Sequence, residues 1–319
     1  MQFYKKNNWT PIKIILFFAA VLLIAFLPIS SFLFYLKNDA FTGYFPPKFF
    51  MSESIRDGFL PLWNPYINYG FPQYGDMSSG FMSPITWLIA STVGYNAYTF
   101  TLETLIYILI AGLGMYKLAE HWQLKQSTRI IAGIVFMCCG YQIGHLQHFN
   151  WLSGAAFFPC CVWAYLNLLK AATAKNIVSA ALLFYLLISS AHPGITIGSI
   201  YFFMGITIFY FLENSKTDFR FKKKKLFGIA IFILLLLVVS IGLIVSYADI
   251  IPHFVRGSKS SFTSSTLDNS SIQSWISLLL PLSIVKNEQF FQSDLSLRNS
   301  YTGISILLFF IIACFNKKN

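Results

Sequence analysis

The chain has 319 residues, of which 56% are hydrophobic, 18% aromatic and only 11% charged, whereas a typical soluble domain carries about 25% charged residues. With a mean hydropathy of +0.61, this composition excludes a soluble globular enzyme, a disordered chain and a secreted disulfide scaffold. A multi-pass helical membrane protein remains, because the apolar runs are long and continuous rather than alternating as in a membrane β-barrel.

Eight apolar segments approach the length of about 20 residues that a membrane-spanning helix needs. They are Ile14–Leu36, Asn96–Ala119, Thr128–Gly144, Trp151–Leu169, Asn176–Ala191, Gly194–Leu212, Leu226–Tyr247 and Tyr301–Phe315. The first follows three lysines but is too long for the apolar core of a signal peptide, so we interpret it as a retained anchor. The sequence therefore predicts an all-α fold, a polytopic helical bundle forming one transmembrane domain over residues 1–319.

The net charge of +11 is distributed unevenly over this topology. With a cytoplasmic N-terminus, the inner side holds 16 of the 23 Lys and Arg residues and three of the 12 acids. Cytoplasmic loops of membrane proteins carry such an excess of Lys and Arg. The positive charge thus predicts orientation in a lipid bilayer, and we expect no nucleic-acid partner.

Two outer segments are long enough to carry a functional site, residues 37–83 and residues 249–300. The first contains twelve aromatic residues, five prolines, five glycines and four acids. Within it, Pro47–Asp57 is predicted to form a short helix at the membrane interface, and Leu60–Tyr66 a rigid turn. Pro84–Gly94 is apolar but too short to cross, which favours a re-entrant or interfacial piece. The aromatic rings suit sugar or lipid head groups, or else an aromatic belt at the bilayer surface.

Carboxylates at the membrane boundary are candidates for acid–base chemistry. Asp39 directly follows the first apolar segment, where partial desolvation can tune a carboxylate as a base, although an acid at a membrane edge is also ordinary. Asp76 is either a turn residue or a second carboxylate. Glu103 lies within a predicted span, where ionisable residues tend to be functional, or it lies near the outer end and faces water.

Four of the five histidines fall at the predicted outer ends of spans. His145 and His148 are three residues apart, so they could share a helix face and bind a metal, but the lack of a nearby carboxylate in sequence favours a hydrogen-bonding role. His192-Pro193-Gly194 predicts a tight turn. The five cysteines all lie in apolar runs and indicate neither a disulfide framework nor a zinc site. We expect no certain cofactor, and whether a divalent metal takes part stays open.

The first long loop carries a recognisable series of motifs. They are Asn38-Asp39, Phe45-Pro46, Gly58-Phe59-Leu60-Pro61-Leu62-Trp63-Asn64-Pro65-Tyr66, Gly70-Phe71-Pro72 and Ser83-Pro84. In these motifs the chain resembles the YfhO family of bacterial membrane proteins, which look like glycosyltransferases of the GT-C fold. Weaker similarities are Gly144-His145 with Trp151 downstream, and Pro252 with Arg256.

The resemblance implies a GT-C-like bundle in the bacterial plasma membrane, whose first outer loop carries a short interfacial helix. It implies a sugar donor linked to polyprenyl phosphate and an acceptor that is an envelope polymer or a glycolipid. It also places the catalytic acid at Asp39. The remaining candidate substrate-binding residues are Arg56, Trp63, Asn64, Tyr66, Asp76, His145, His148 and Arg256, with rings stacking on the sugar and cations offsetting charge on the departing phosphate.

Two rival functions use the same outer aromatics. A transporter or flippase for lipid-linked sugars would use them as a gate, but it predicts ionisable residues along a midplane path, and the spans contain almost none apart from Glu103. A non-catalytic membrane subunit or pseudoenzyme is the second rival. Members of the family are usually longer, so we expect this chain to be a truncated product or a short relative.

Overall fold

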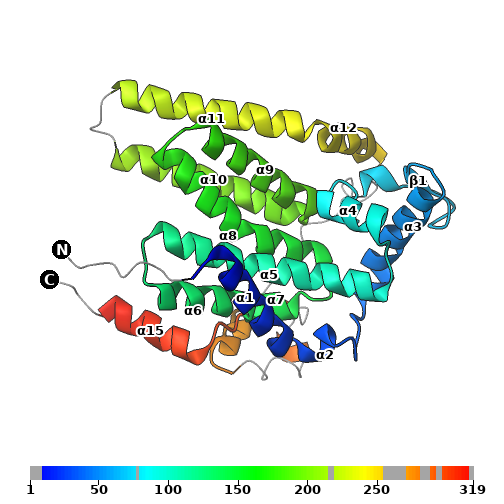
Figure 1. Ribbon diagram of the computed structural model, residues 1–319, viewed down its shortest axis with the longest axis horizontal. Helices are drawn as coiled ribbons and strands as arrows, with labels where there is room; N and C mark the ends of the chain where they lie inside the picture. The colour runs from blue at the N-terminus through cyan, green and yellow to red at the C-terminus, as the bar shows by residue number, and fades with distance from the viewer. Residues whose placement is uncertain are drawn as a thin grey trace.

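The computed structural model describes residues 9–76, 79–214, 219–253, 271–280, 288–291 and 297–315. These residues form an all-α bundle with one two-residue β-ladder (Figure 1). The longer helices are α1 (Pro11–Ala25), α3 (Phe45–Arg56), α5 (Ala97–His121), α6 (Gln126–Met137), α8 (Phe149–Lys170), α9 (Ala174–Ser190), α10 (Pro193–Glu213), α11 (Phe219–Val239), α12 (Ile241–Ile250) and α15 (Ile304–Phe315). The short elements are α2 (Leu27–Ser30), α4 (Pro84–Thr92), α7 (Gly140–Gly144), α14 (Glu288–Phe291), β1 (Trp63–Asn64) and β2 (Phe71–Pro72).

Four helical segments are long and apolar enough to cross a membrane: Ala97–His121, Gln126–Gly144, Phe149–Lys170 and Pro193–Glu213. A fifth is reached if α11 and α12, which meet at a bend of 60°, form one broken span. By length and composition the chain is therefore a multi-pass membrane protein. Three of the eight expected segments form shorter apolar helices of 10–17 residues, which are α1, α9 and α15.

The first apolar segment differs from the expectation for a physical reason. We expected one helix over Ile14–Leu36, but α1 ends at Ala25 and a separate turn, α2, begins at Leu27. Pro28 has no backbone N–H to donate and its ring crowds the preceding turn, so a helix cannot run through it undisturbed. The break leaves α1 with 15 residues, which span about 23 Å at 1.5 Å per residue.

The centre of the bundle is the pair α5 and α8, flanked by α6 and α9, with α1 on α5 and α11 on α9 (Figure 1). Glycines allow the closest approaches between these helices. A side chain at Gly133 of α6 would lie 2.5 Å from the ring of Phe18 in α1, and Gly112 of α5 lies against Met137. Phe18 and Met137 are fully buried there. The small residues at these helix crossings therefore leave room for large apolar side chains.

An apolar cavity of about 580 Å³ lies among α8, α9, α10, α11 and α12. Phe184, Phe203 and Phe232 line it from three of these helices, and the Phe184 ring contacts the other two. Thr196, one turn into α10, also lines it. The cavity thus extends along the bundle between α10 and α11.

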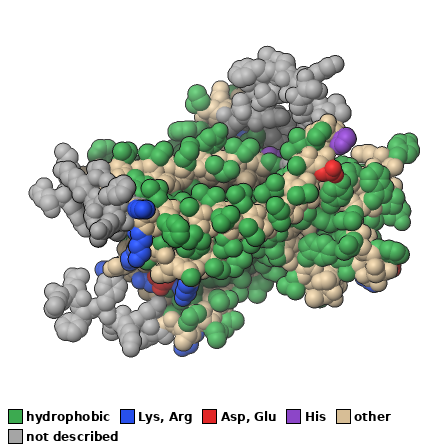
Figure 2. All heavy atoms as spheres, turned by 90° about the horizontal axis from the view of Figure 1, so that it is seen from above, with side chains coloured by type: hydrophobic (Ala, Val, Ile, Leu, Met, Phe, Trp, Pro, Cys, Tyr) green, Lys and Arg blue, Asp and Glu red, His purple; other side chains and the backbone are tan. Residues whose placement is uncertain are grey.

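The two ends of the bundle differ in charge. We call the end with Lys117, Lys125, Arg129, Lys170 and Lys225 the lysine end, and the end with the first long loop the loop end. On the face drawn in Figure 2, most Lys and Arg side chains gather at one end.

The first long loop folds against the bundle. Its helix α3 agrees with the prediction over Pro47–Asp57 within two residues, and it is preceded by a π-helical turn, η1 (Ala40–Tyr44). The buried face of α3 carries Pro47, Lys48, Met51 and Ser52 and packs against α4, and Lys48 reaches Glu103 of α5. This buried face of α3 therefore contacts the protein and does not contact lipid.

Candidate functional site

The backbone turn after α2 places Asp39 at the loop end. Asn38 adopts a left-handed conformation (φ 54°), and its carbonyl accepts hydrogen bonds from the amides of Phe41 and Thr42. This turn starts η1 and leaves the Asp39 side chain 63% exposed. A carboxylate in this position is accessible from outside the bundle.

Asp39 and Asn38 contact two consecutive residues that lie more than 100 positions later in the chain. The Oδ2 atom of Asp39 lies 3.4 Å from Nε2 of His148, and the Asn38 amide donates to Oε1 of Gln147 over 2.9 Å. Gln147 and His148 belong to the connection between α7 and α8, and His148 is the residue directly before α8. The loop end therefore pairs a carboxylate with an imidazole that is 20% exposed.

A row of stacked aromatic rings lies next to the Asp39–His148 pair. His145 stacks on Tyr141 (centroids 4.1 Å apart) and on Trp151 (5.5 Å), and Trp151 stacks on His192 (4.7 Å). The rings come from α7, from the start of α8 and from the residue before α10. We call Asp39, His145, His148, Trp151 and His192 the outer cluster.

His192 stands in this cluster although the sequence predicted only a tight turn there. Its Nδ1 accepts a hydrogen bond from the amide of Gly194, so the neutral ring carries its proton on Nε2. Burial, and next the neighbouring His148, lower the pKa of His192 below its ordinary value of 6.5. The ring is therefore neutral at pH 7 and can donate from Nε2.

Two polar side chains, Tyr44 and Asn150, lie next to the outer cluster. The phenol of Tyr44 donates to Oδ1 of Asn150 over 2.8 Å, and the carbonyl of Asn150 accepts from the amide of His192. Burial, with Asp39 and then Asp76 nearby, raises the pKa of Tyr44 to about 12. Within the described residues, the buried Nδ2 of Asn150 has no hydrogen-bond partner. The site thus contains a spare amide donor beside a protonated phenol.

A buried ion pair holds the first loop to the start of α8. The Lys48 amine lies 3.0 Å from a carboxylate oxygen of Glu103, and both side chains are fully buried. Thr86 and Tyr95 add hydrogen bonds, and the amine lies 4.2 Å from the centre of the Phe149 ring. Burial lowers the pKa of Lys48, and Glu103 opposes that shift. The sequence drew attention to Glu103, which does not face water, but gave no sign of Lys48 as its partner.

The His145 and His148 pair does not share a helix face as the spacing had allowed. Helix α7 ends at Gly144, so His145 lies just beyond it and His148 just before α8; their rings are 5.7 Å apart. His145 contacts the carbonyl of Tyr141 through Nδ1. Over the residues that the structure describes, no group of three or more His, Cys, Asp or Glu side chains is placed to hold a metal ion.

The remaining predicted residues lie elsewhere along the loop. The β1–β2 ladder pairs Trp63 with Pro72, and the Trp63 ring covers Gly70. Asn64 is buried and accepts from the amide of Tyr66, whose side chain is 85% exposed. Among the described contacts, none joins these residues to the outer cluster.

The last three candidate site residues are Arg56, Asp76 and Arg256. Arg56 ends α3 and forms an exposed ion pair with Glu53 over 2.9 Å. Asp76 follows the turn Gln73–Gly75, which packs against α12. Arg256 lies outside the described residues. The structure therefore brings together Asp39, His145 and His148.

Comparisons with protein-family models, with curated proteins and with solved structures find no match to this chain.

Proposed function

We propose that the chain is a membrane glycosyltransferase that moves a sugar from a polyprenyl-phosphate carrier to an acceptor hydroxyl at the loop end. The observation that carries the proposal is the pairing of Asp39 with His148 across an accessible surface. A carboxylate whose partner imidazole holds it in place can accept a proton from a hydroxyl group. The acceptor is an envelope polymer or a glycolipid, and the YfhO-like motifs of the first loop support the assignment.

In the proposed reaction the acceptor oxygen bonds to the anomeric carbon as the bond from that carbon to the phosphate oxygen breaks. The hydroxyl proton passes to Asp39, and the lipid phosphate leaves with the electron pair. Neutral His192 and the nearby His148 would donate hydrogen bonds to the departing phosphate, which gains negative charge. Trp151, stacked on His145 and His192, would hold the two imidazole rings in position.

The apolar cavity near this site would hold the lipid part of the donor. The apolar cavity between α10 and α11 includes Thr196, one helical turn beyond His192. The head group of the donor would then lie at the outer cluster, and its polyprenyl chain would lie in the cavity. We further propose eight crossings in a bacterial plasma membrane with a cytoplasmic N-terminus, counting α1, α9 and α15 as short spans.

The test is transfer of a labelled sugar from a polyprenyl-phosphate donor by protein reconstituted in liposomes. Asp39→Asn should abolish most of the transfer, whereas Asp57→Asn, an acid in the same loop at the end of α3, should leave it unchanged. Full activity of the Asp39→Asn protein at normal expression would refute the role of Asp39.

The same reconstitution separates the rival functions. Movement of the labelled lipid across the membrane without transfer would indicate a flippase, and neither movement nor transfer would indicate a non-catalytic subunit. The ion pair of Glu103 with Lys48 disfavours ion-coupled transport, because it neutralises the acid that such a path would use.

A further inference from the structure

A small basic cavity lies at the lysine end, far along the bundle from the outer cluster. It has a volume of about 240 Å³ and is lined by Lys170, Ala171, Ala172, Thr173, Lys224 and Lys225. These residues come from the turn between α8 and α9 and from the first turns of α11. Three lysines from two separate segments thus converge on one hollow.

Close packing fixes these two segments to each other. A side chain at Gly228 would lie 2.4 Å from the Cβ of Ala172, so only glycine allows α11 to approach the turn this closely. The Lys225 side chain is buried, and its amine donates a hydrogen bond to the carbonyl of Lys170 at the end of α8. The two segments that wall the cavity are therefore fixed to each other by packing, with Lys225 buried between them and Lys170 and Lys224 exposed.

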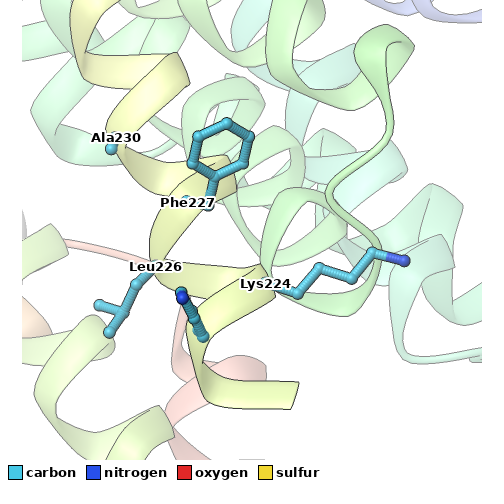
Figure 3. Close-up of a pocket in the computed structure, with 5 residues that line it drawn as sticks. Lys224, Leu226, Phe227 and Ala230 are labelled. Atoms are coloured by element: carbon cyan, nitrogen blue, oxygen red, sulfur yellow. The ribbon is translucent and has the colours of Figure 1, made fainter. Parts of the chain in front are cut away.

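An apolar hollow of about 590 Å³ adjoins the basic cavity and is lined by Lys223, Lys224, Leu226, Phe227 and Ala230 (Figure 3). Lys224 belongs to both. The Phe227 side chain is 67% exposed and Leu226 is 54% exposed, on a helix expected to lie in lipid. The basic cavity and the apolar strip thus share Lys224 on α11.

The charge balance at this end favours an anionic ligand. Within the described residues, no ion pair joins Lys170, Lys223 or Lys224 to an acid, whereas the neighbouring Glu120 pairs with Lys117 and Arg129. Ammonium groups held close together repel one another, and a bound anion relieves that repulsion. The positive-inside pattern places this end at the cytoplasmic leaflet, where basic pockets between helices bind anionic lipid head groups.

We propose that the lysine end binds one anionic phospholipid, with its phosphodiester between Lys170 and Lys224 and an acyl chain along Leu226, Phe227 and Ala230. The combination of a basic cavity with an exposed apolar strip selects a lipid over a soluble phosphate compound. This site is separate from the proposed transferase site and does not depend on it.

The test is lipid binding to the purified full chain, measured by native mass spectrometry with phosphatidylglycerol and phosphatidylcholine of identical acyl chains. We expect tighter binding of phosphatidylglycerol. The double variant Lys170→Gln/Lys224→Gln should weaken it about 30-fold, since each lysine near an anionic surface contributes roughly a factor of five. The control is Lys175→Gln, an exposed lysine one turn away in α9 that does not line the cavity, and it should bind normally.

Three outcomes would overturn the proposal. They are equal binding of the two lipids, an equal loss in the Lys175→Gln control, and displacement of phosphatidylglycerol by an equal concentration of glycerol phosphate, which would indicate a soluble anion as the ligand. The thermal midpoint of each variant in phosphatidylcholine checks folding. Lys225 is left intact because its buried amine bonds to the backbone of α8.

Discussion

The amine of Lys48 lies 3.0 Å from the carboxylate of Glu103, and neither side chain is exposed to solvent. The pair joins α3 of the first loop to α5, and Thr86 of α4 donates to the same carboxylate. Because the Lys48 amine also lies over the ring of Phe149, it connects the loop to the start of α8, where Asn150 and Trp151 reach the outer cluster. This ion pair therefore positions the loop that carries Asp39.

Removing one partner of this pair should be far more damaging than replacing both. Glu103→Gln should destabilise the fold by about 3–5 kcal/mol, because it leaves a buried ammonium without its counter-charge. The double variant Lys48→Met/Glu103→Leu should lose much less, since two apolar side chains need no partner. Thermal unfolding in detergent measures both, and equal losses in the single and double variants would contradict the assignment.

Replacement of His148 should lower transfer activity without unfolding the protein. His148→Gln keeps a polar group near Asp39 but removes the imidazole, so we expect kcat to fall roughly 100-fold, the lower end of general acid–base contributions. His253→Gln, a change in an exposed histidine at the same end, is the control. A KM effect alone, with kcat unchanged, would show that His148 binds substrate and takes no part in the chemistry.

Stability should depend on pH through His192. Its pKa is lowered in the folded protein, so below about pH 6.5 the unfolded chain binds a proton that the folded protein resists. The free energy of unfolding should therefore fall as pH drops through 6.5 and level off below the folded pKa. In His192→Asn, whose amide can still cap α10, this slope should diminish. Thermal midpoints of the two proteins between pH 7.5 and pH 5 measure it, and parallel curves would exclude His192 as the cause.

Gly70 should tolerate no side chain. It has φ +122°, and an added Cβ would lie 2.4 Å from the Trp63 ring. Gly70→Ala should destabilise the β1–β2 ladder by about 1–3 kcal/mol through backbone strain and displacement of that ring. Gly43→Ala is the matched control, because nothing lies within 4 Å of its Cβ position. Limited proteolysis of the first loop should be faster for Gly70→Ala only.

Part of the site could be predicted from the sequence. Asp39, His145 and His148 were candidates because they lie at predicted ends of spans, and the structure places them together. His192 and Tyr44 were missed as members of the site, since a turn motif and one aromatic among twelve gave no sign of their contacts. Lys48 was missed because a lysine in a loop ordinarily faces water.

The sequence by itself determined that this chain belongs in a membrane and roughly where its apolar helices lie, because hydropathy is a local property. The break of the first apolar segment near Pro28 was not predicted. It also determined which end of the bundle carries the lysines. Only the tertiary structure decided that Asp39 meets His148 and that Lys48 meets Glu103, residues 109 and 55 positions apart. Such partners are selected by how helices pack, through glycine contacts and buried rings spread over the whole chain, and no local pattern records that choice.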